Sequence, residues 1–232
     1  MALTPELIES FSEAVLNSRY DNPQPTPEFH KKVWDYCCSD HKQVAIAAPR
    51  GHAKSTAGTL AYPLTALLFG YKDFVLILSN TEKQASSFLL TIFSELADNE
   101  LLIEMFGKMR FLTESKSEII VQMEDGRKFC VMARGATQSM RGAKWGHKRP
   151  DLVVFDDVED DDTVANQEVR NGFKQHVLSM VLPIGGDTAD IRIFGTILHL
   201  DSMLENYTPE YQVPEEIKDK EQYLVREDLC TY

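Results

Sequence analysis

The stretch Val44-Ala45-Ile46-Ala47-Ala48-Pro49-Arg50-Gly51-His52-Ala53-Lys54-Ser55 decides the fold. It begins with a short apolar run, continues through a loop with Pro and Gly, and ends where a segment of helical periodicity starts. This is the pattern of a buried strand, a tight loop and a helix. Similar short apolar runs alternate with helical segments along the chain. The alternation predicts an α/β protein with a mainly parallel, doubly wound sheet and helices on both faces.

The expected elements follow from periodicity and turn signals. Strands are expected at residues 44–48, 74–78, 152–155 and 191–194, and a hairpin of 117–122 with 127–132 around the turn Asp125-Gly126. Helices are expected at residues 5–16, 28–38, 55–69, 81–98 and 166–181, and a polar loop at 133–144. We expect one domain over residues 1–208, with 1–40 as a helical segment packed on it, and a linker or docking tail at 209–232.

Composition narrows the class of protein. The chain has 232 residues, enough for a full core, and a formal net charge of −12. This charge argues against a protein that coats nucleic acid, but it permits a local basic patch. The four cysteines lack zinc-ligand spacing, and no apolar run approaches the ~20 residues of a membrane span. Acidic residues within the N-terminal helix exclude a signal peptide, so a cytoplasmic protein is expected.

Residues 48–55 resemble the phosphate loop G-x-x-x-x-G-K-[ST], with Ala48 and Ala53 at the two usual Gly positions. Backbone N–H groups and the start of the following helix can still cradle phosphates, and Gly51 gives the loop flexibility. We expect Lys54 to be exposed in the loop and to reach the β- and γ-phosphates, and Ser55 to ligate Mg²⁺. The alternative is an ordinary strand–loop–helix joint.

A second motif is Leu152-Val153-Val154-Phe155-Asp156-Asp157-Val158-Glu159, an apolar strand that ends in acids. Such a strand needs a cation at its end, so Asp156 is predicted to hold Mg²⁺. One of the next acids would activate the attacking water. In an extended chain Asp157 and Glu159 face the same side, and we prefer Asp157 with Glu159 as the alternative. The acids at 160–162 are interpreted as a solvated loop or helix cap.

Two weaker signals lie elsewhere. Thr196, after the expected strand at 191–194, can sense the γ-phosphate. The loop at 133–144 contains two Arg-Gly pairs, Arg134-Gly135 and Arg141-Gly142, which suit phosphate contact. The most basic stretch of the chain is completed by Lys144, His147, Lys148 and Arg149. This stretch is interpreted as an arginine finger, a DNA contact or a solvated loop.

Five segments, taken in order, resemble the large terminase subunits of tailed bacteriophages. They are residues 49–56, 76–85, 139–142, 154–159 and 194–199, and the resemblance spans roughly residues 25 to 205. The ATPase domains of that family belong to the additional-strand class of P-loop proteins. A phosphate loop with an internal arginine, here Arg50, is rather specific to terminases.

The resemblance implies an ATPase that uses Mg²⁺ and drives double-stranded viral DNA into a procapsid. It implies Arg50 as an arginine acting within the subunit, Arg141 as a finger reaching a neighbour's site, and Thr196 as the coupling residue. Adenine contacts would fall near Phe29 and His30, or near Gln43. The implied nucleotide-binding residues are Pro49, Arg50, Gly51, His52, Ala53, Lys54, Ser55, Thr56 and Thr196.

The implied partners are DNA, the portal protein and the small terminase subunit. A chain that is a monomer alone would form a homo-oligomeric ring on the portal, in the host cytoplasm and transiently on the procapsid. Two residues depart from the family pattern: Ala53 replaces the usual Gly, and Asp157 stands where Glu is commoner. Both departures bear on the rate of ATP hydrolysis more than on nucleotide binding. Family members also carry a C-terminal nuclease of RNase H type, which we do not expect in the sequence up to Tyr232.

Three alternatives remain at this point. The acids 156–162 can serve a metal-dependent nuclease, although RNase H-like sites gather carboxylates from several strands. A helicase-like translocase shares the ATPase core but needs a second motor domain. A non-catalytic, nucleotide-binding assembly module would explain the two alanines in the phosphate loop.

Overall fold

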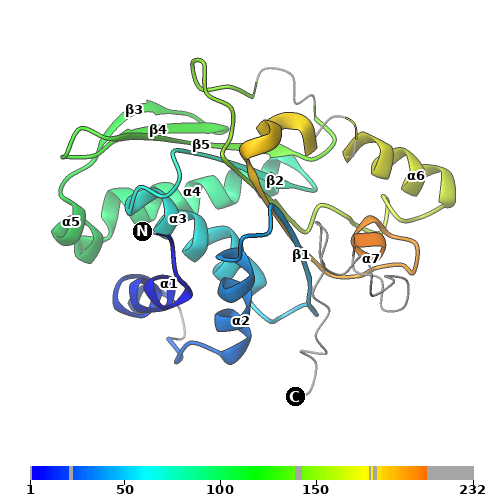
Figure 1. Ribbon diagram of the computed structural model, residues 1–232, viewed down its shortest axis with the longest axis horizontal. Helices are drawn as coiled ribbons and strands as arrows, with labels where there is room; N and C mark the ends of the chain where they lie inside the picture. Colours follow the sequence, from blue (N-terminus) through cyan, green and yellow to red (C-terminus); the bar gives the residue numbers. More distant parts are fainter. Residues whose placement is uncertain (1, 21–22, 139–142, 178, 180–181, 208–232) are drawn as a thin grey trace.

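The computed structural model describes residues 2–20, 23–138, 143–177, 179 and 182–207. These residues build a seven-stranded sheet in the order β1-β7-β6-β2-β5-β4-β3, with helices packed around it (Figure 1). The strands are β1 (Gln43–Ala47), β2 (Phe74–Ser79), β3 (Arg110–Glu114), β4 (Glu118–Gln122), β5 (Lys128–Gly135), β6 (Leu152–Asp156) and β7 (Asp190–Gly195). The predicted α/β class and the four predicted buried strands are confirmed.

The sheet is parallel from β1 to β5, and the pairs β5–β4 and β4–β3 are antiparallel. The hairpin predicted around Asp125-Gly126 is therefore confirmed. The prediction of a loop from residue 133 is wrong, because β5 continues to Gly135 and pairs there with Ser79 of β2. Strand β3 escaped prediction because none of its side chains is fully buried, so its apolar signal is weak.

The helices agree with the sequence pattern in place and differ at their ends. They are α1 (Pro5–Phe11), α2 (Glu28–Cys37), α3 (Tyr62–Leu68), α4 (Glu82–Asp98), α5 (Glu100–Phe106), α6 (Gln167–His176) and α7 (Met203–Tyr207). A π-helical turn at Ser12–Leu16 extends α1, and another at Thr56–Ala61 leads into α3. Helix α6 covers the first part of the predicted helix 166–181. The short helices α5 and α7 were not predicted.

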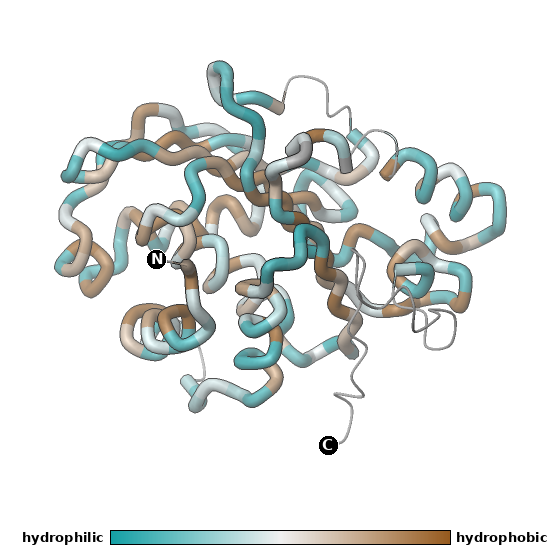
Figure 2. The backbone as a smooth tube through the Cα atoms, viewed as in Figure 1, coloured by the Kyte–Doolittle hydropathy of each residue, from teal (hydrophilic) through white to brown (hydrophobic). Residues whose placement is uncertain are grey.

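The sheet separates two apolar cores, as the alternation along β2 shows. Val75 and Ile77 join a core with α1 to α5, while Phe74, Leu76 and Leu78 join a second core with α6 and α7. Hydrophobic segments accordingly concentrate in the strands at the centre of the molecule (Figure 2). The doubly wound arrangement with helices on both faces is thus confirmed.

Strand β7 lies between β1, which leads into the phosphate loop, and β6, which ends in the acids. This inserted strand is the additional strand that the resemblance implies. The helical segment after the loop packs closely on β7, since a Cβ at Gly58 would lie 2.5 Å from the Phe194 ring. Glycine at position 58 therefore brings the start of that helix next to the sheet.

Several expectations fall partly or wholly outside the described residues. The predicted tail 209–232 and Arg141 lie outside them, and the domain boundary at 208 stays a prediction. In the described part, no helix combines the length and hydrophobicity that a membrane crossing requires. Cys37, Cys38 and Cys130 form no disulfide among these residues.

Candidate nucleotide-binding site

The candidate site lies where three neighbouring strands end. The carboxyl ends of β1, β7 and β6 meet at one edge of the sheet, which is where ligands bind in open α/β sheets. The loop 48–53 follows β1, Thr196 follows β7, and the acids 156–159 end β6. The sequence motifs predicted to carry the chemistry are therefore brought together by the strand order.

The predicted phosphate loop turns sharply before its helix begins. The Ala48 N–H donates to the Gly195 carbonyl at 2.9 Å, so the loop starts in register with β7. Gly51 and Ala53 then take left-handed backbone angles, with φ of +87° and +51°. The N–H groups of Thr56 and Ala57 donate back to the Ala53 carbonyl. The helix thus begins at the loop, and its free N–H groups face the edge where phosphates can bind.

Lys54 is buried, so the prediction of an exposed loop lysine is wrong. It sits in the first turn of the helix and is 6% exposed. Its Nζ lies 3.0 Å from Oδ2 of Asp157 and 3.1 Å from Oγ1 of Thr196. Burial follows because the lysine points inward along the sheet edge toward the ends of β6 and β7. One ammonium group therefore links all three motifs.

Ser55 and Asp156 form the second link. The Ser55 hydroxyl lies 2.9 Å from both carboxylate oxygens of Asp156, whose residue is fully buried. Burial raises the pKa of Asp156 to about 6, and the neighbouring Asp157 charge adds to the rise while the Ser55 hydroxyl opposes it. A buried carboxylate beside a hydroxyl is an oxygen donor set that suits Mg²⁺. The residues present therefore fit the predicted metal.

Asp157 departs from the extended conformation assumed for the motif. Its φ is +43°, and its N–H donates to the Phe194 carbonyl at 2.9 Å. Aspartate tolerates this left-handed region better than most residues. The kink turns the Asp157 carboxylate toward Lys54, and one third of this side chain, 34%, stays exposed. Asp157 can therefore meet both the lysine and solvent.

Glu159 points elsewhere, so the prediction that Asp157 and Glu159 share one side is wrong. Its two carboxylate oxygens accept the backbone N–H groups of Met203 and Leu204 at 2.6 and 2.9 Å. These N–H groups open helix α7, where a negative charge is stabilising. Burial raises the pKa of Glu159, while the two N–H donors hold it down. The residue ties the end of β6 to α7.

Thr196 completes the cluster at the end of β7. Its hydroxyl accepts a hydrogen bond from the Lys54 ammonium and donates one to the Ala48 carbonyl, each at 3.1 Å. Arg50 is exposed on the loop, and Pro49 and His52 are half-buried. Arg141, the predicted finger, lies outside the described residues. The structure thus joins Lys54, Ser55, Asp156, Asp157 and Thr196, and leaves Arg50 facing solvent.

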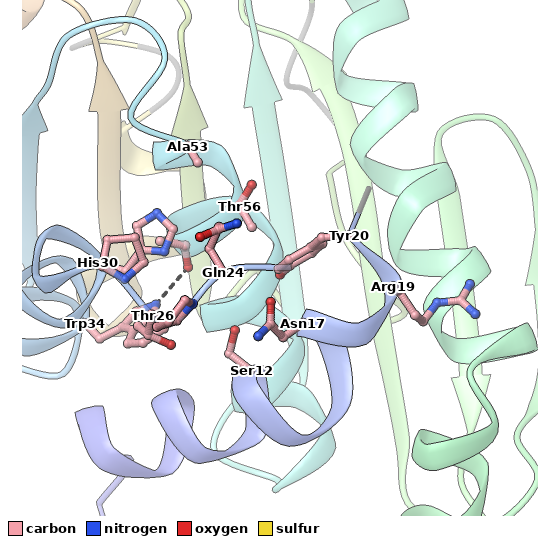
Figure 3. Close-up of a pocket in the computed structure, with 13 residues that line it drawn as sticks. Ser12, Asn17, Arg19, Tyr20, Gln24, Thr26, His30, Trp34, Ala53 and Thr56 are labelled. Carbon is pink, nitrogen blue, oxygen red and sulfur yellow. Dashed lines mark hydrogen bonds between the residues drawn. The ribbon is translucent and has the colours of Figure 1, made fainter. Parts of the chain in front are cut away.

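The sequence did not reveal a cavity of about 520 Å³ beside the phosphate loop. In Figure 3, His30, Trp34 and Gln24 gather on one side of this cavity, near Ala53 and Thr56 of the loop. Trp34 Nε1 donates to the Ala57 carbonyl at 3.1 Å, which fixes α2 against the helix that follows the loop. The remaining lining residues are Ser12, Asn17, Arg19, Tyr20, Pro25, Thr26, Pro27 and Ala57.

The cavity bears on where the base of a nucleotide would lie. His30 lines the cavity, and its Nε2 lies 3.3 Å from the His52 carbonyl of the phosphate loop. Gln43 is the first residue of β1, at the opposite end of the strand from the loop. Of the two segments that the resemblance suggested, the geometry favours the one containing Phe29 and His30.

Strand β7 lies between β1, which is followed by the loop 48–53, and β6, which ends in acids. This is the strand order that the resemblance to additional-strand P-loop proteins implies. No protein-family model matches the sequence, and no characterised protein sequence matches it. The large terminase ATPase domain of Thermus phage P74-26 is similar, with a TM-score of 0.64 and 14% identity over 97% of this chain and 84% of the other. A mutant of that domain gives a TM-score of 0.60 with the same identity and coverage.

The DNA packaging motor Phi-28 gp11 is more distant, with a TM-score of 0.43 and 18% identity over 82% of this chain and 55% of the other. The likeness to the P74-26 domain shows that the fold is that of a phage large terminase ATPase domain, as the sequence resemblance predicted. At 14% identity the structural likeness shows the fold alone, and any proposal about chemistry rests on the residues of the site.

Proposed function

We propose that this chain is the ATPase domain of a viral DNA-packaging motor and that it hydrolyses ATP at the edge formed by β1, β7 and β6. The observation that carries the proposal is the cluster around Lys54. Its ammonium lies within 3.1 Å of groups from both other motifs, Asp157 Oδ2 and Thr196 Oγ1. A plain strand–loop–helix joint has no need to bury a lysine between an acid and a hydroxyl.

Each residue has a defined task in the proposal. The loop N–H groups and Lys54 bind the β- and γ-phosphates, and Ser55 and Asp156 hold Mg²⁺. When bound, Mg²⁺ neutralises charge on the phosphates. Asp157 orients the attacking water and accepts its proton, because its carboxylate is partly exposed beside Lys54. Thr196, which contacts Lys54, registers the loss of the γ-phosphate.

The nucleoside would occupy the cavity lined by His30, Trp34 and Thr56. Its volume of about 520 Å³ lies within the range of small-molecule sites. Burial lowers the pKa of His30, which favours the neutral ring, and a neutral ring can pack against an uncharged base. Phe29 supports the ring, with its centroid 5.9 Å from that of His30.

The remaining parts of the proposal follow the terminase resemblance. The proposed partners are double-stranded DNA, a portal protein and a small terminase subunit, with the chain assembling as a ring in the host cytoplasm. Arg141 would reach into the neighbour's site, and an arginine finger is worth about 10³–10⁵ in rate in well-studied cases. Arg50, exposed on the phosphate loop, is the candidate for the same task within the subunit.

A nuclease is less well supported by the same residues. Glu159, the third acid of the cluster, gives both of its oxygens to the N–H groups of α7. Among the described residues, no group of three or more His, Cys, Asp and Glu side chains is arranged to hold a metal ion. Asp156 and Asp157 contact Ser55 and Lys54, which is the arrangement a phosphate-loop ATPase needs.

The proposal is tested by Lys54→Ala and by the release of inorganic phosphate from Mg²⁺–ATP. We expect hydrolysis to be abolished and binding of a fluorescent ATP analogue to be weakened. Lys83→Ala removes the same charge from an exposed site on α4 and should hydrolyse as the wild type does. Because Lys54 is buried, the thermal unfolding of both variants is compared, and Lys54→Arg serves as a variant that keeps charge and bulk. Normal turnover by folded Lys54→Ala would refute the proposal.

A further inference from the structure

The proposed ATP site leaves unused the most basic part of the chain. Residues 143–149, which we call the basic loop, contain no acid and lead directly into Pro150 and β6. Its four basic or titratable side chains, Lys144, His147, Lys148 and Arg149, are exposed. In a chain with a formal net charge of −12, this concentration of cations on one exposed loop calls for an anionic partner.

The basic loop has defined structure. Trp145 and Lys148 exchange two backbone hydrogen bonds of 3.1 and 3.0 Å and form an antiparallel bridge. The Trp145 ring packs edge-on against Phe74 of the second core, with ring centroids 6.4 Å apart. The Lys148 ammonium lies 5.2 Å above the Trp145 ring. The loop is therefore anchored to the fold and presents its charges from a fixed base.

An open depression of about 430 Å³ borders the basic loop. Lys148 and Arg149 form one wall, and the Gly185-Gly186 turn forms another. Two acids also line it, but both are engaged within the fold. Asp73 pairs with Lys148 at 2.6 Å, and Asp151 accepts the N–H groups of Asp73 and Phe74 at 2.8 and 3.0 Å.

The charges that remain available are those of Lys144 and Arg149. Neither forms an ion pair with another described residue, and Arg149 only donates to the Pro183 carbonyl at 3.3 Å. Arg149 lines the depression, and Lys144 is exposed on the same loop. Such cations suit the phosphates of a nucleic-acid backbone, which receive most protein hydrogen bonds to DNA. The basic loop is neither a helix nor a two-stranded ribbon that could enter a groove, so backbone contact independent of sequence is expected.

We propose that the basic loop binds the phosphate backbone of double-stranded DNA. The inference rests on the proposed function, since a packaging motor must hold its DNA. The loop sits at the amino end of β6, and Asp156 and Asp157 sit at its carboxyl end. Five residues of strand separate the two, on the order of 15 Å at about 3.3 Å per residue. DNA and ATP can therefore bind together, joined by one buried strand.

The test is the binding of a short fluorescein-labelled DNA duplex, measured by anisotropy without nucleotide over a series of salt concentrations. In Lys144→Ala/Arg149→Ala we expect affinity to fall by about 10-fold or more near 0.1 M salt. The slope of log affinity against log salt should fall by about 2, since each lost phosphate contact removes about 0.9. Two duplexes of unrelated sequence should behave alike.

The matched control is Lys83→Ala/Lys116→Ala, which removes two exposed positive charges from α4 and the β3–β4 turn. It should bind DNA as the wild type does. Failure of wild-type chain to bind, equal weakening by both pairs, or an unchanged salt slope would overturn the inference. Loss of ATP turnover with unchanged DNA affinity would assign the loop to a neighbour's ATP site instead, and would also overturn it. DNA binding that depends on the loop in a chain without ATPase activity would refute only the proposed function.

Discussion

The two ends of strand β6 carry opposite charges in opposite environments. At the carboxyl end Asp156 is fully buried, and the nearby Lys54 is 6% exposed. At the amino end Lys144, Lys148 and Arg149 are all exposed. Both ends carry charged side chains, but only those at the carboxyl end are buried. Under the two proposals above, the buried end serves chemistry and the exposed end serves contact with DNA.

The difference has a physical basis. Electrostatic stabilisation of a reacting phosphate is stronger when water is excluded, so charges that act in chemistry are worth burying despite the desolvation cost. A phosphate backbone that must slide past is better held by solvated charges, whose attraction is screened by salt. Variants at the buried end should therefore change rate and stability, and variants at the exposed end should change affinity alone.

The largest loss of rate with nucleotide binding retained is expected from Asp157→Asn. Asparagine tolerates the left-handed angle at this position, so the fold should survive while the proton acceptor is lost. We expect the hydrolysis rate to fall by about 10²–10⁴-fold with nucleotide binding retained. Single-turnover hydrolysis and binding of a fluorescent ATP analogue separate the two. A normal rate here, with the loss appearing in Glu159→Gln, would reverse the assignment of the base.

The second effect concerns the cost of burying Asp156. Its pKa of about 6 lies above the usual value near 4. The folded chain therefore holds this proton to higher pH than the unfolded chain does. In buffer without Mg²⁺ and nucleotide, the free energy of unfolding should fall as pH rises from about 4 to about 6, by up to about 3 kcal/mol.

Asp156→Asn should remove this pH dependence and unfold less readily than the wild type at pH 7, while losing hydrolysis. Urea unfolding at several pH values makes the measurement. Asp161→Asn removes one charge from an exposed position in the adjoining loop and controls for net charge. Equal pH dependence in Asp156→Asn and the wild type would contradict the burial argument.

The third effect tests whether Glu159 has a structural role, which is to hold helix α7 against the end of β6. Glu159→Gln keeps the size of the side chain but loses its charge, so it can accept only one of the two N–H groups of Met203 and Leu204 well. Hydrogen bonds to charged groups are worth about 1.5–3 kcal/mol, and we expect a loss of stability of about 2 kcal/mol. Hydrogen exchange in 203–207 should speed up, while the rate of hydrolysis stays within several-fold of wild type.

The sequence predicted the strands well because buried parallel strands are short, continuous apolar runs. It also predicted that Lys54, Asp157 and Thr196 lie at one edge, since parallel strands bring their carboxyl ends together. It failed on the direction of Asp157 and Glu159, because a single left-handed residue cancels the alternation of an extended chain. That angle of +43° has no signature in the sequence beyond the Asp itself.

The burial of Lys54 and the cavity beside Trp34 also could not be predicted from the sequence. Both depend on contacts between segments far apart in the chain: Lys54 with Thr196, and Trp34 with Ala57. Local periodicity reports which face of a helix is apolar, but it carries no information on which distant segment covers that face. The short helix α7, held by Glu159, was missed for the same reason.

The smallest effect is expected where the phosphate loop departs from its usual pattern. Alanine stands at both usual glycine positions, but the two differ in backbone. Ala53 has φ of +51° and is exposed, whereas Ala48 is buried and is not among the residues with positive φ. A left-handed angle costs a non-glycine residue about 1 kcal/mol, and glycine avoids this cost.

Ala53→Gly should therefore stabilise the chain by about 1 kcal/mol or less, since the added freedom of the unfolded glycine offsets part of the gain. Ala48→Gly relieves nothing and loses a buried methyl group, so it should destabilise by about 1 kcal/mol. Thermal unfolding of the two variants side by side makes the comparison. If ATP turnover also rises in Ala53→Gly, backbone strain at Ala53 limits the rate of hydrolysis in the wild type. Destabilisation by both variants would show that Ala53 carries no strain.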